Sequence, residues 1–446
     1  MDKGEIIRMN IILLSGGSGK QLWPLSNDVR SKQFVRLFRN ESGKYESMLQ
    51  RVYRQIIMVD KNARITVATT PEQVGVIKHQ LGDTVKICVE PSRRDTFAAI
   101  ALSLAYLHDK LGVSENEIII VCPVDFFVED DFYKEVKKLE EIVLEKVNDV
   151  VLMGIQQVCP SNKYGHIIPE VFDRVSKVKK FKEKVSMEEA NKYFMHGALW
   201  NAGVFAFKLG NMLGKLQRMI GSRKYNELFS NFNGLPRASF DYMVVREAKN
   251  VWVMRCACEW ADLGDWNVIT EYMSDHVRGN AMLDDICENT YVINEIGIPV
   301  LCMGGKNKII AASSDGILVL DKKFEPDVKR YVEKINENIR YAEKSWGTYT
   351  VIDAQPGSIV VRLGLQAGKR MKYHSHELRD EAWTITSGFG KCIVDGMEQF
   401  VRPGDVISVA AGCKHVLIAE TDMNIIEVQT GTEISQDDKK VFDIND

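Results

Sequence analysis

The stretch "LSGGSGKQLWPLS", residues 14–26, follows a short apolar run and places three glycines within four residues. Such glycines let backbone N–H groups approach phosphate oxygens, because no Cβ stands in the way. A Walker loop is excluded, since it needs glycine where Leu14 stands and serine or threonine where Gln21 stands. A dinucleotide fingerprint is also excluded, because its third glycine falls at Leu22. The loop therefore predicts another kind of phosphate site, with a simple tight turn as the alternative.

The bulk composition limits the kind of protein. The chain has 446 residues, 45% of them hydrophobic, and a formal net charge of −3, so we expect two or three domains. It has no long basic block and no apolar run of the ~20 residues that a membrane helix needs, which argues against nucleic-acid and membrane partners. No signal-peptide pattern precedes the first apolar run. Nine scattered cysteines predict reduced thiols and a cytoplasmic protein, and "CAC" at Cys256 and Cys258 has no second pair to suggest a metal site.

Apolar runs alternate with helical patterns over the first 270 or so residues. Residues 9–17, 64–70, 117–125 and 149–155 are typical of buried strands, and residues 96–112 and 132–147 of helices. This alternation predicts an α/β fold with a mostly parallel sheet covered on both faces. Ligands of such sheets bind beyond the carboxyl ends of the strands. The glycine loop and Asp125 both fall at that edge.

The pattern changes near residue 275 and again near 345. Residues 276–321 hold short β-type runs, residues 325–344 have a helical pattern, and the chain after Trp346 is almost entirely short strands with glycine turns. We therefore expect domains at 1–275 and 346–446, joined by a β-rich segment, 276–345, that ends in a helix. A homo-oligomer formed through this segment is a further expectation.

Several segments carry a resemblance to a known family. The loop together with "RSKQF" resembles the signature of sugar-nucleotide pyrophosphorylases, and its "WPLS" and "KQF" pieces indicate mannose-1-phosphate guanylyltransferases. Over residues 10–345 the family order continues through "EPSRRDTFAAIAL", "PVDFF", "KYGHI", "KKFKEK", "WNAGVFAFK", "SFDYMVVREA" and "WADLGDW". The resemblance implies a Rossmann-like nucleotidyltransferase domain at 1–275. In that reaction a phosphate oxygen of a sugar 1-phosphate attacks the α-phosphorus of a nucleoside triphosphate, and pyrophosphate leaves. GTP is the expected nucleotide and mannose 1-phosphate the expected sugar phosphate.

The resemblance also implies the site residues. Asp125 and Asp262 would hold Mg²⁺, which prefers oxygen ligands, with a strand-end cap and a turn as the alternatives. Lys32 would contact phosphate, and its alternative is an exposed surface lysine. With Lys20 and Gln21 these three residues make up the expected catalytic group. Nucleotide binding is implied for Leu14, Gly16, Gly17, Ser18, Gly19, Glu90, Arg94, Asp95, Thr96 and Pro123. Sugar-phosphate binding is implied for Tyr164, Gly165, Glu183, Lys184, Asn201, Gly203 and Asp241.

Two departures from the family pattern leave other functions open. Gln21 stands where the family usually has arginine, which removes a cation that can grip phosphate oxygens, although Lys20 is next to it. Asp95 stands in place of asparagine and adds a negative charge. One alternative is a nucleotidyltransferase for another base or acceptor, such as a cytidylyltransferase serving surface polymers. The other alternative is a sugar-nucleotide-binding regulatory protein with low activity.

A second, independent signal lies in the C-terminal region. "HSHELRDE" and the later "GDVISVAAGCKH" place His374, His376, Glu381 and His415 at the spacing of the two cupin motifs. His374 and His376 are two residues apart on an expected strand, so they point the same way. Three imidazoles and one carboxylate suit Zn²⁺, Fe²⁺, Mn²⁺ or Ni²⁺. Surface histidines in a hairpin are the alternative.

A guanylyltransferase followed by a cupin resembles the bifunctional mannose-1-phosphate guanylyltransferase/mannose-6-phosphate isomerase family. "KSWGTYTVID", "LRDEAW" and "EVQTG" resemble its isomerase half, and Arg379 matches an arginine that would bind the substrate phosphate. The family has glutamine where His374 stands and histidine where Ala382 stands. The residue pattern therefore predicts the metal site, and isomerase activity is what the resemblance implies.

Overall fold

The computed structural model describes residues 8–17, 19–146, 149–335, 339–435 and 438–443. The chain forms two compact units. The first consists of Met1–Gly17, Gln33–Val74 and Val85–Ser274, and the second of Ser18–Lys32, Gly75–Thr84 and Asp275–Asp446. The glycine loop therefore leaves the first unit after its second glycine, and the chain returns to that unit at Gln33.

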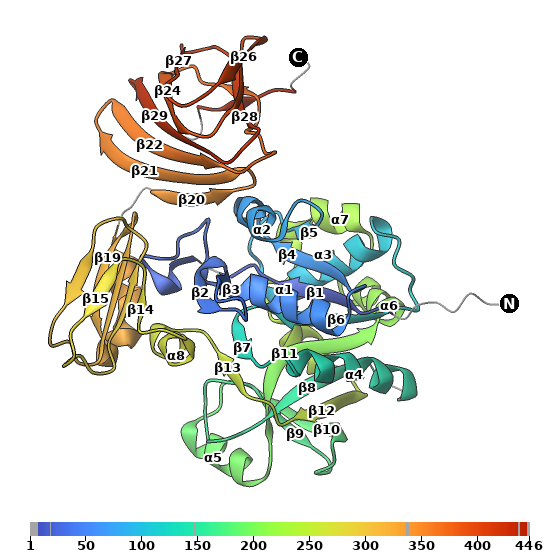
Figure 1. Ribbon diagram of the computed structural model, residues 1–446. Helices are drawn as coiled ribbons and strands as arrows, with labels where there is room; N and C mark the ends of the chain where they lie inside the picture. The colour runs from blue at the N-terminus through green and yellow to red at the C-terminus, as the bar shows by residue number, and fades with distance from the viewer. Residues whose placement is uncertain (1–7, 18, 147–148, 336–338, 436–437, 444–446) are drawn as a thin grey trace. The chain divides into compact units, whose positions relative to one another are not determined.

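The first unit is built on a nine-stranded sheet of order β5-β4-β1-β6-β11-β8-β12-β10-β9 (Figure 1). Neighbouring strands from β5 to β6 are parallel, as are β8 and β12, and the other pairs are antiparallel. Leu14, the last residue of β1, pairs with Ala68 and Pro123, so three carboxyl ends share one edge. The strands are β1 (Asn10–Leu14), β4 (Arg64–Thr69), β5 (Lys86–Val89), β6 (Ile118–Pro123), β8 (Val150–Gln156), β9 (His166–Pro169), β10 (Val175–Lys182), β11 (Leu199–Lys208) and β12 (Val251–Cys256).

Helices cover this sheet. α3 (Asp95–Asp109) buries ten of its 15 residues against β1, β4 and β5 and packs on α6 and α7, which explains its nearly continuous apolar sequence. α4 (Phe132–Glu145) packs on β8, β11 and α1, so the expected α/β fold is confirmed. The other elements are α1 (Met48–Val59), α5 (Met187–Met195), α6 (Leu209–Ile220), α7 (Tyr225–Ser230), α8 (Trp266–Tyr272), β2 (Arg36–Arg39), β3 (Tyr45–Ser47), β7 (Phe126–Val128) and β13 (Trp260–Asp262).

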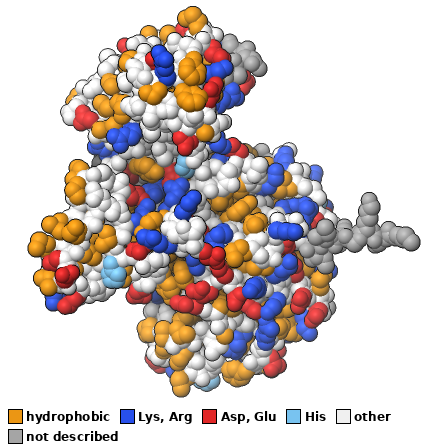
Figure 2. All heavy atoms as spheres, in the orientation of Figure 1, with side chains coloured by type: hydrophobic (Ala, Val, Ile, Leu, Met, Phe, Trp, Pro, Cys, Tyr) orange, Lys and Arg blue, Asp and Glu red, His pale blue; other side chains and the backbone are white. Residues whose placement is uncertain are grey.

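The second unit includes two small sheets of short, mostly parallel strands. β14 pairs with β16 and β16 with β18, all in parallel, and β15 pairs with β17 in the same sense, while β19 closes the larger sheet antiparallel to β18. This segment exposes large apolar side chains, seen as orange spheres over β15 and β19 in Figure 2. They include Met282, Leu301, Met303, Ile317 and Val319. The strands are β14 (Val277–Arg278), β15 (Ala281–Leu283), β16 (Tyr291–Asn294), β17 (Val300–Cys302), β18 (Lys308–Ser313) and β19 (Gly316–Asp321).

The helix expected over residues 325–344 is wrong in its last part. A 3-10 turn, Lys322–Asp327, and α9 (Val328–Val332) open the stretch, residues 336–338 lie outside the described residues, and a strand, β20 (Tyr341–Lys344), ends it. β20 pairs antiparallel with β21, with Tyr341 opposite Thr350. Pairing with a later segment thus overrides a local helical pattern, because tertiary contacts outweigh weak intrinsic propensities. α2 (Val74–Leu81) also lies almost entirely in the second unit.

The C-terminal region is a two-sheet β structure, as expected of a cupin. A six-stranded sheet of order β20-β21-β22-β29-β24-β27 faces a five-stranded sheet of order β26-β25-β28-β23-β30 (Figure 1). Apolar side chains from both sheets, the fully buried Trp383 among them, form the core between them. The remaining strands are β21 (Gly347–Gln355), β22 (Ser358–Leu365), β23 (His374–Ser375), β24 (Arg379–Ser387), β25 (Gly390–Val394), β26 (Met397–Val401), β27 (Val406–Val409), β28 (His415–Ala419), β29 (Met423–Gly431) and β30 (Lys440–Val441).

One cysteine pair departs from the expectation of reduced thiols. Cys256 and Cys258, the "CAC" pair at the end of β12, are joined by a disulfide. The two cysteines lie close because only one residue separates them where the strand ends. Among the helices in the described part of the chain, none is both long and apolar enough to cross a membrane.

Candidate functional site

The first two glycines of the loop lie at the carboxyl edge of the sheet. Gln33 fixes this backbone, since its Nε2 donates to the Ser15 carbonyl at 2.8 Å. A Cβ added to Gly16 would lie 3.4 Å from Oε1 of Glu90. Glu90 therefore lies beside the loop. Burial raises the pKa of Glu90 to about 7, although the positive charge of Arg93 acts in the opposite direction. Gln33 was not among the predicted site residues, although it lies in the quoted "KQF" piece.

The second half of the loop belongs to the second unit. Ser18 lies outside the described residues. A Cβ on Gly19 would stand 1.8 Å from the Asn27 carbonyl oxygen, so glycine is required here by a close backbone approach rather than by a ligand. Lys20 and Gln21 are exposed on the 3-10 turn Gly19–Leu22. Lys32 is only 4% exposed and is therefore not a surface lysine.

The two predicted magnesium ligands lie next to each other. β7 and β13 pair antiparallel with Phe126 opposite Asp262, and the N–H of Leu263 donates to the carbonyl of Asp125 at 3.1 Å. The charge of Asp262 also acts on Tyr164. Burial first, and then this charge, raise the pKa of the tyrosine to about 12. Two strands that are distant in the sequence thus bring the acids together. Their carboxylate oxygens fit the preference of Mg²⁺ for hard donors.

A cleft of about 450 Å³ opens in the first unit, within the size range of small-molecule sites. Asp95 stands in this cleft with the predicted sugar-phosphate residues, although the motif order placed it with the nucleotide. Asp95 and Lys184 both have left-handed backbones, with φ of 67° and 51°, a strain that is common at functional sites. The lining residues are Asp95, Asn162, Lys163, Tyr164, Gly165, Glu183, Lys184, Ala238, Ser239 and Tyr242.

Asn201, Gly203 and Asp241 form a hydrogen-bonded group. The register of β11 against β8 shifts between Asn201 and Phe205, and Gly203 takes a φ of +68° there. The Nδ2 of Asn201 donates to Oδ1 of Asp241 at 2.8 Å, and its Oδ1 accepts from the N–H of Gly203 at 3.1 Å. Burial, and secondly the charge of Glu183, raise the pKa of Asp241 to about 7. Asn201 is therefore a positioning partner for a buried acid as well as a turn residue.

Other predicted residues are held by backbone contacts. The Nε of Arg94 donates to the Leu235 carbonyl at 2.9 Å. The hydroxyl of Thr96 accepts from the N–H of Phe240 at 2.9 Å, next to Asp241 in the chain. Pro123 ends β6 against Gly203, where an added Cβ would lie 3.2 Å from its Cγ. These contacts hold the backbone next to Asp241 and Gly203 in place.

The cupin region brings its three histidines together in the barrel interior. Imidazole nitrogens of His374, His376 and His415 all lie within 4.8 Å of one another, and all three side chains are buried. Glu381 lies 3.2 Å from His376 Nε2 and 3.3 Å from His415 Nε2. The three-histidine, one-carboxylate set expected from the motifs is thus assembled, and these donors fit a divalent transition metal.

The histidine rings are oriented by backbone carbonyls. Nδ1 of His374 lies 2.6 Å from the Lys372 carbonyl, Nδ1 of His415 lies 2.9 Å from that of Cys413, and Nδ1 of His376 contacts that of Asp438. A proton on each Nδ1 leaves a lone pair on Nε2, the arrangement of metal-binding histidines. Burial lowers the pKa of His374 to about 2, so this imidazole is neutral and able to ligate.

Arg379 and a second acid complete the cupin interior. Arg379 donates from Nε to Glu381 Oε1 at 3.1 Å, and its NH2 lies 2.9 Å from His376 Nε2. Glu427, opposite Trp383 on β29, has its pKa raised to about 8, first by burial and then by the Glu381 charge. Sequence reasoning did not single out Glu427, although it begins the quoted "EVQTG" segment. Its polar partner Gln429 lies two residues later, on the same face of the strand.

The fold and the two sites define a nucleotidyltransferase followed by a cupin domain. Residues 10–278 match the family described as Nucleotidyl transferase, and residues 333–444 match Mannose-6-phosphate isomerase C-terminal. Since the first match spans more than half of the chain, the chain belongs to the nucleotidyl transferase family and is an enzyme of that class. The two matches follow one another in the order of the nucleotidyltransferase and cupin domains that the motifs indicated.

Relatives match over almost the whole chain. A mannose-1-phosphate guanylyltransferase of Escherichia coli K12 is 26% identical over 96% of this chain and 96% of its own length. The alginate biosynthesis protein AlgA of Pseudomonas syringae pv. tomato is 26% identical over 97% and 95%. A solved structure described as mannose-1-phosphate geranyltransferase from Thermus thermophilus is 28% identical, with a TM-score of 0.62, over 74% of this chain and 99% of its own.

Proposed function

We propose that the first 275 residues transfer the nucleotidyl group of GTP to mannose 1-phosphate and so produce GDP-mannose. A phosphate oxygen of the sugar 1-phosphate forms a bond to the α-phosphorus, the bond to the bridging oxygen of the β-phosphate breaks, and pyrophosphate leaves. The observation that carries the proposal is the cleft in which Tyr164, Gly165, Glu183 and Lys184 meet. The names of the relatives supply the base and the sugar.

The residue roles follow from the chemistry of phosphoryl transfer, in which positioning and charge neutralisation dominate. Lys184 offers a cation to the sugar phosphate at the cleft, and Lys20 and Lys32 offer cations to the triphosphate. Asp125 and Asp262 would hold Mg²⁺, which neutralises phosphate charge. The Asn201–Asp241 pair is placed to hold sugar hydroxyls, because a buried carboxyl group with one amide donor retains further hydrogen-bonding capacity.

The test is a substrate panel that measures pyrophosphate release with Mg²⁺ present. GTP, CTP, UTP and ATP are each combined with mannose 1-phosphate, glucose 1-phosphate and a non-sugar phosphate. We expect rapid release only with GTP and mannose 1-phosphate. Release with a different pair would keep the chemistry but refute the substrate assignment, which is the cytidylyltransferase type of alternative that Asp95 motivates.

The regulatory alternative has its own arm. If folded, metal-loaded protein shows no turnover with any pair, the enzyme proposal fails and a sugar-nucleotide-binding role replaces it. Gln21→Arg then gives a direct comparison, because this substitution restores the phosphate-gripping cation of the family. Activity that appears only in the variant would identify Gln21 as the cause of the low turnover.

We also propose that the cupin domain, residues 346–446, interconverts fructose 6-phosphate and mannose 6-phosphate. The supporting observation is the interior set of His374, His376, His415 and Glu381 beside Arg379. A bound divalent metal would polarise the sugar oxygens, Arg379 would pair with the phosphate, and Glu427 is available to hold or release a proton near neutral pH. The test follows mannose 6-phosphate formation by metal-loaded protein, with Glu381→Gln as the inactive control; absence of any interconversion refutes it.

The connecting segment, residues 276–345, is proposed as the contact of a homo-oligomer. Its exposed apolar residues, among them Met282, Leu301 and Met303, support this, since large apolar patches often mark interaction sites. The substitution Leu301→Glu at an exposed position of β17 should convert the oligomer to monomers in sedimentation experiments. A wild-type chain that sediments as a monomer would refute the assignment.

A further inference from the structure

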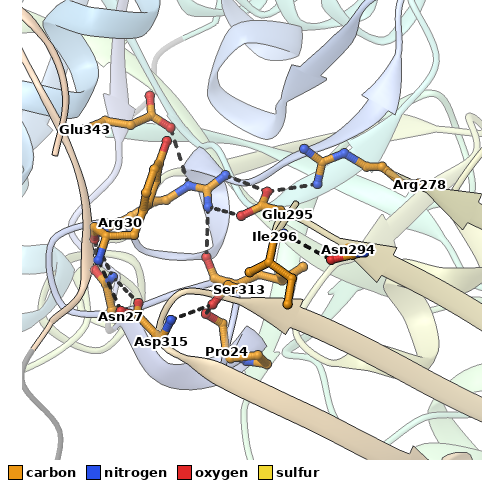
Figure 3. A network of polar contacts seen from close by, with 12 residues as sticks. Pro24, Asn27, Arg30, Arg278, Asn294, Glu295, Ile296, Ser313, Asp315 and Glu343 are labelled. Carbon is orange, nitrogen blue, oxygen red and sulfur yellow. Dashed lines mark hydrogen bonds and ion pairs between the residues drawn. The ribbon is translucent and has the colours of Figure 1, made fainter. Parts of the chain in front are cut away.

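A buried ion cluster surrounds Arg30, which lies in the segment between the glycine loop and Gln33. Arg30 is 2% exposed, and its guanidinium contacts Glu295 through two nitrogens, at 2.7 and 3.1 Å. Its Nε lies 3.4 Å from Oε1 of Glu343, a fully buried residue of β20 (Figure 3). Arg278 pairs with the same Glu295 at 3.0 Å. The paired contact to Glu295 is the fork geometry that fixes direction as well as distance.

The same cluster fixes the backbone of the loop. The side-chain NH1 of Arg30 donates to the Leu25 carbonyl at 3.3 Å. The backbone N–H of Arg30 donates to Oδ1 of Asn27 at 2.8 Å. Asn27 in turn donates from Nδ2 to Oδ2 of Asp315 at 2.7 Å. The Ser313 hydroxyl donates to the Pro24 carbonyl at 2.6 Å (Figure 3). The long-range partners of residues 24–30 thus come from residues 295–343, outside the Rossmann-like sheet.

The charges in this cluster persist over the whole working pH range. Burial alone would raise the pKa of Glu295, but Arg30 and Arg278 outweigh it and lower that pKa to about 2. Burial lowers the pKa of Arg30, but Glu295 outweighs it and the net shift is upward. Neither group can escape its burial by changing protonation, so removal of one partner leaves an uncompensated charge. The cluster is therefore a fixed connection and not a pH switch.

We propose that Arg30 is a positioning residue for nucleotidyl transfer. Its ion cluster holds the backbone of residues 24–30, in the segment that carries Lys20, Gln21 and Lys32, through contacts from the connecting segment and from β20 within the second unit. This inference rests on the proposed function of the first domain. Catalysis that depends on positioned charges loses rate when those charges move by as little as about 1 Å. Arg30 thus acts on the reaction through the loop and not by contact with the substrate.

The experiment compares Arg30→Gln and Glu295→Gln with a matched control, Arg278→Gln. Arg278 pairs with the same glutamate from a position outside the loop, so its loss leaves the Arg30–Glu295 pair in place. Hydrogen exchange of the amides in residues 19–33 reports loop order in the full chain. We expect faster exchange in the first two variants and an exchange rate close to wild type in the control.

Steady-state kinetics on the best substrate pair provide the second readout. We expect kcat/KM for the triphosphate to fall by about 10²-fold in Arg30→Gln and Glu295→Gln. Arg30→Lys keeps the charge without the fork and should recover part of the loss, and it replaces Arg30→Gln if that variant does not fold. Cupin metal content, measured on each variant, checks that the rest of the second unit is intact. A purely structural role would lower the unfolding temperature but leave kcat/KM of the folded enzyme unchanged.

The outcomes separate this inference from the proposed function. Active wild type with both variants within about twofold of it in kcat/KM overturns the inference alone, since the expected loss is about 10²-fold. Unchanged exchange over residues 19–33 in Arg30→Gln also overturns it, because the loop then does not depend on the cluster. Wild type that is silent with every substrate pair refutes the proposed function, and the inference falls with it.

Discussion

Asp241 offers a test of the electrostatics in the first unit. Its side chain is buried, accepts one hydrogen bond from Asn201, and has a pKa raised from 3.8 to about 7, mainly by burial and then by Glu183. Each pKa unit corresponds to about 1.36 kcal/mol, so a rise of about three units means that ionised Asp241 destabilises the folded state by about 4 kcal/mol. That is a substantial share of a typical domain's stability.

The direction in which stability changes with pH follows from proton binding. Between about pH 4 and pH 7 the folded state holds a proton on Asp241 that the unfolded state has released, so unfolding becomes easier as pH rises. Asp241→Asn removes this titration, while its amide oxygen can still accept from Asn201. We therefore expect the variant to be more stable than wild type by up to about 4 kcal/mol at about pH 8, and the difference to shrink towards zero near pH 4.

The assay is denaturant unfolding of wild type and Asp241→Asn at half-unit steps from about pH 4.5 to 8, the window in which the two states differ in proton binding. Asp131→Asn provides the control, because Asp131 is an exposed acid paired only at the surface with Lys134, and its neutralisation should leave the unfolding midpoint nearly unchanged across this window. A stability difference between Asp241→Asn and wild type that does not vary with pH would refute the reasoning. A variant less stable than wild type at the alkaline end would refute it more directly.

Three further predictions concern the two sites. Asp262→Asn should lower kcat for pyrophosphate release by about 10²–10³-fold and raise the Mg²⁺ concentration needed for half-maximal rate, and an unchanged Mg²⁺ dependence would exclude Asp262 as a ligand. Gly19→Ala should destabilise the loop by about 1–3 kcal/mol because its Cβ meets the Asn27 carbonyl, which loop exchange rates can measure; wild-type rates would contradict the close approach. His415→Ala should lose the cupin metal, and one equivalent retained in elemental analysis would argue against this ligand.

The edge of the sheet was predictable because its rule is topological. Carboxyl ends of neighbouring parallel strands share one edge, so the apolar runs that end near Leu14 and Asp125 predict that both residues lie at this edge, and Leu14 does pair with Pro123 there. The cupin histidines were predictable for a similar reason. Alternation along a strand places His374 and His376 on one face, and the motif spacing supplied His415.

Long-range partners were not predictable. Arg30 and Glu295 are 265 positions apart, and no local pattern marks a pair at that separation. The strand at Tyr341–Lys344 was mistaken for helix because its pairing partner comes later in the chain. The sequence order likewise grouped Asp95 with the nucleotide residues, whereas the fold places it in the cleft with Lys184. Each of these features depends on tertiary contacts that a sequence window does not contain.

The ion cluster also limits which cation can take the place of the arginine that the family has at position 21. Between the last glycine of the loop and Gln33, the chain carries the cations Lys20, Arg30 and Lys32. Arg30 cannot replace the missing charge, because its guanidinium is buried and already committed to Glu295 and Glu343. Lys20 is exposed on the same turn, so under the proposed function it is the cation placed to supply the charge that the family has at position 21, whereas Lys32 is nearly as buried as Arg30. A lysine offers a point charge without the fork of an arginine, so the loop's own placement has to provide the geometry that the side chain no longer does. A loop fixed by buried ion pairs meets that requirement.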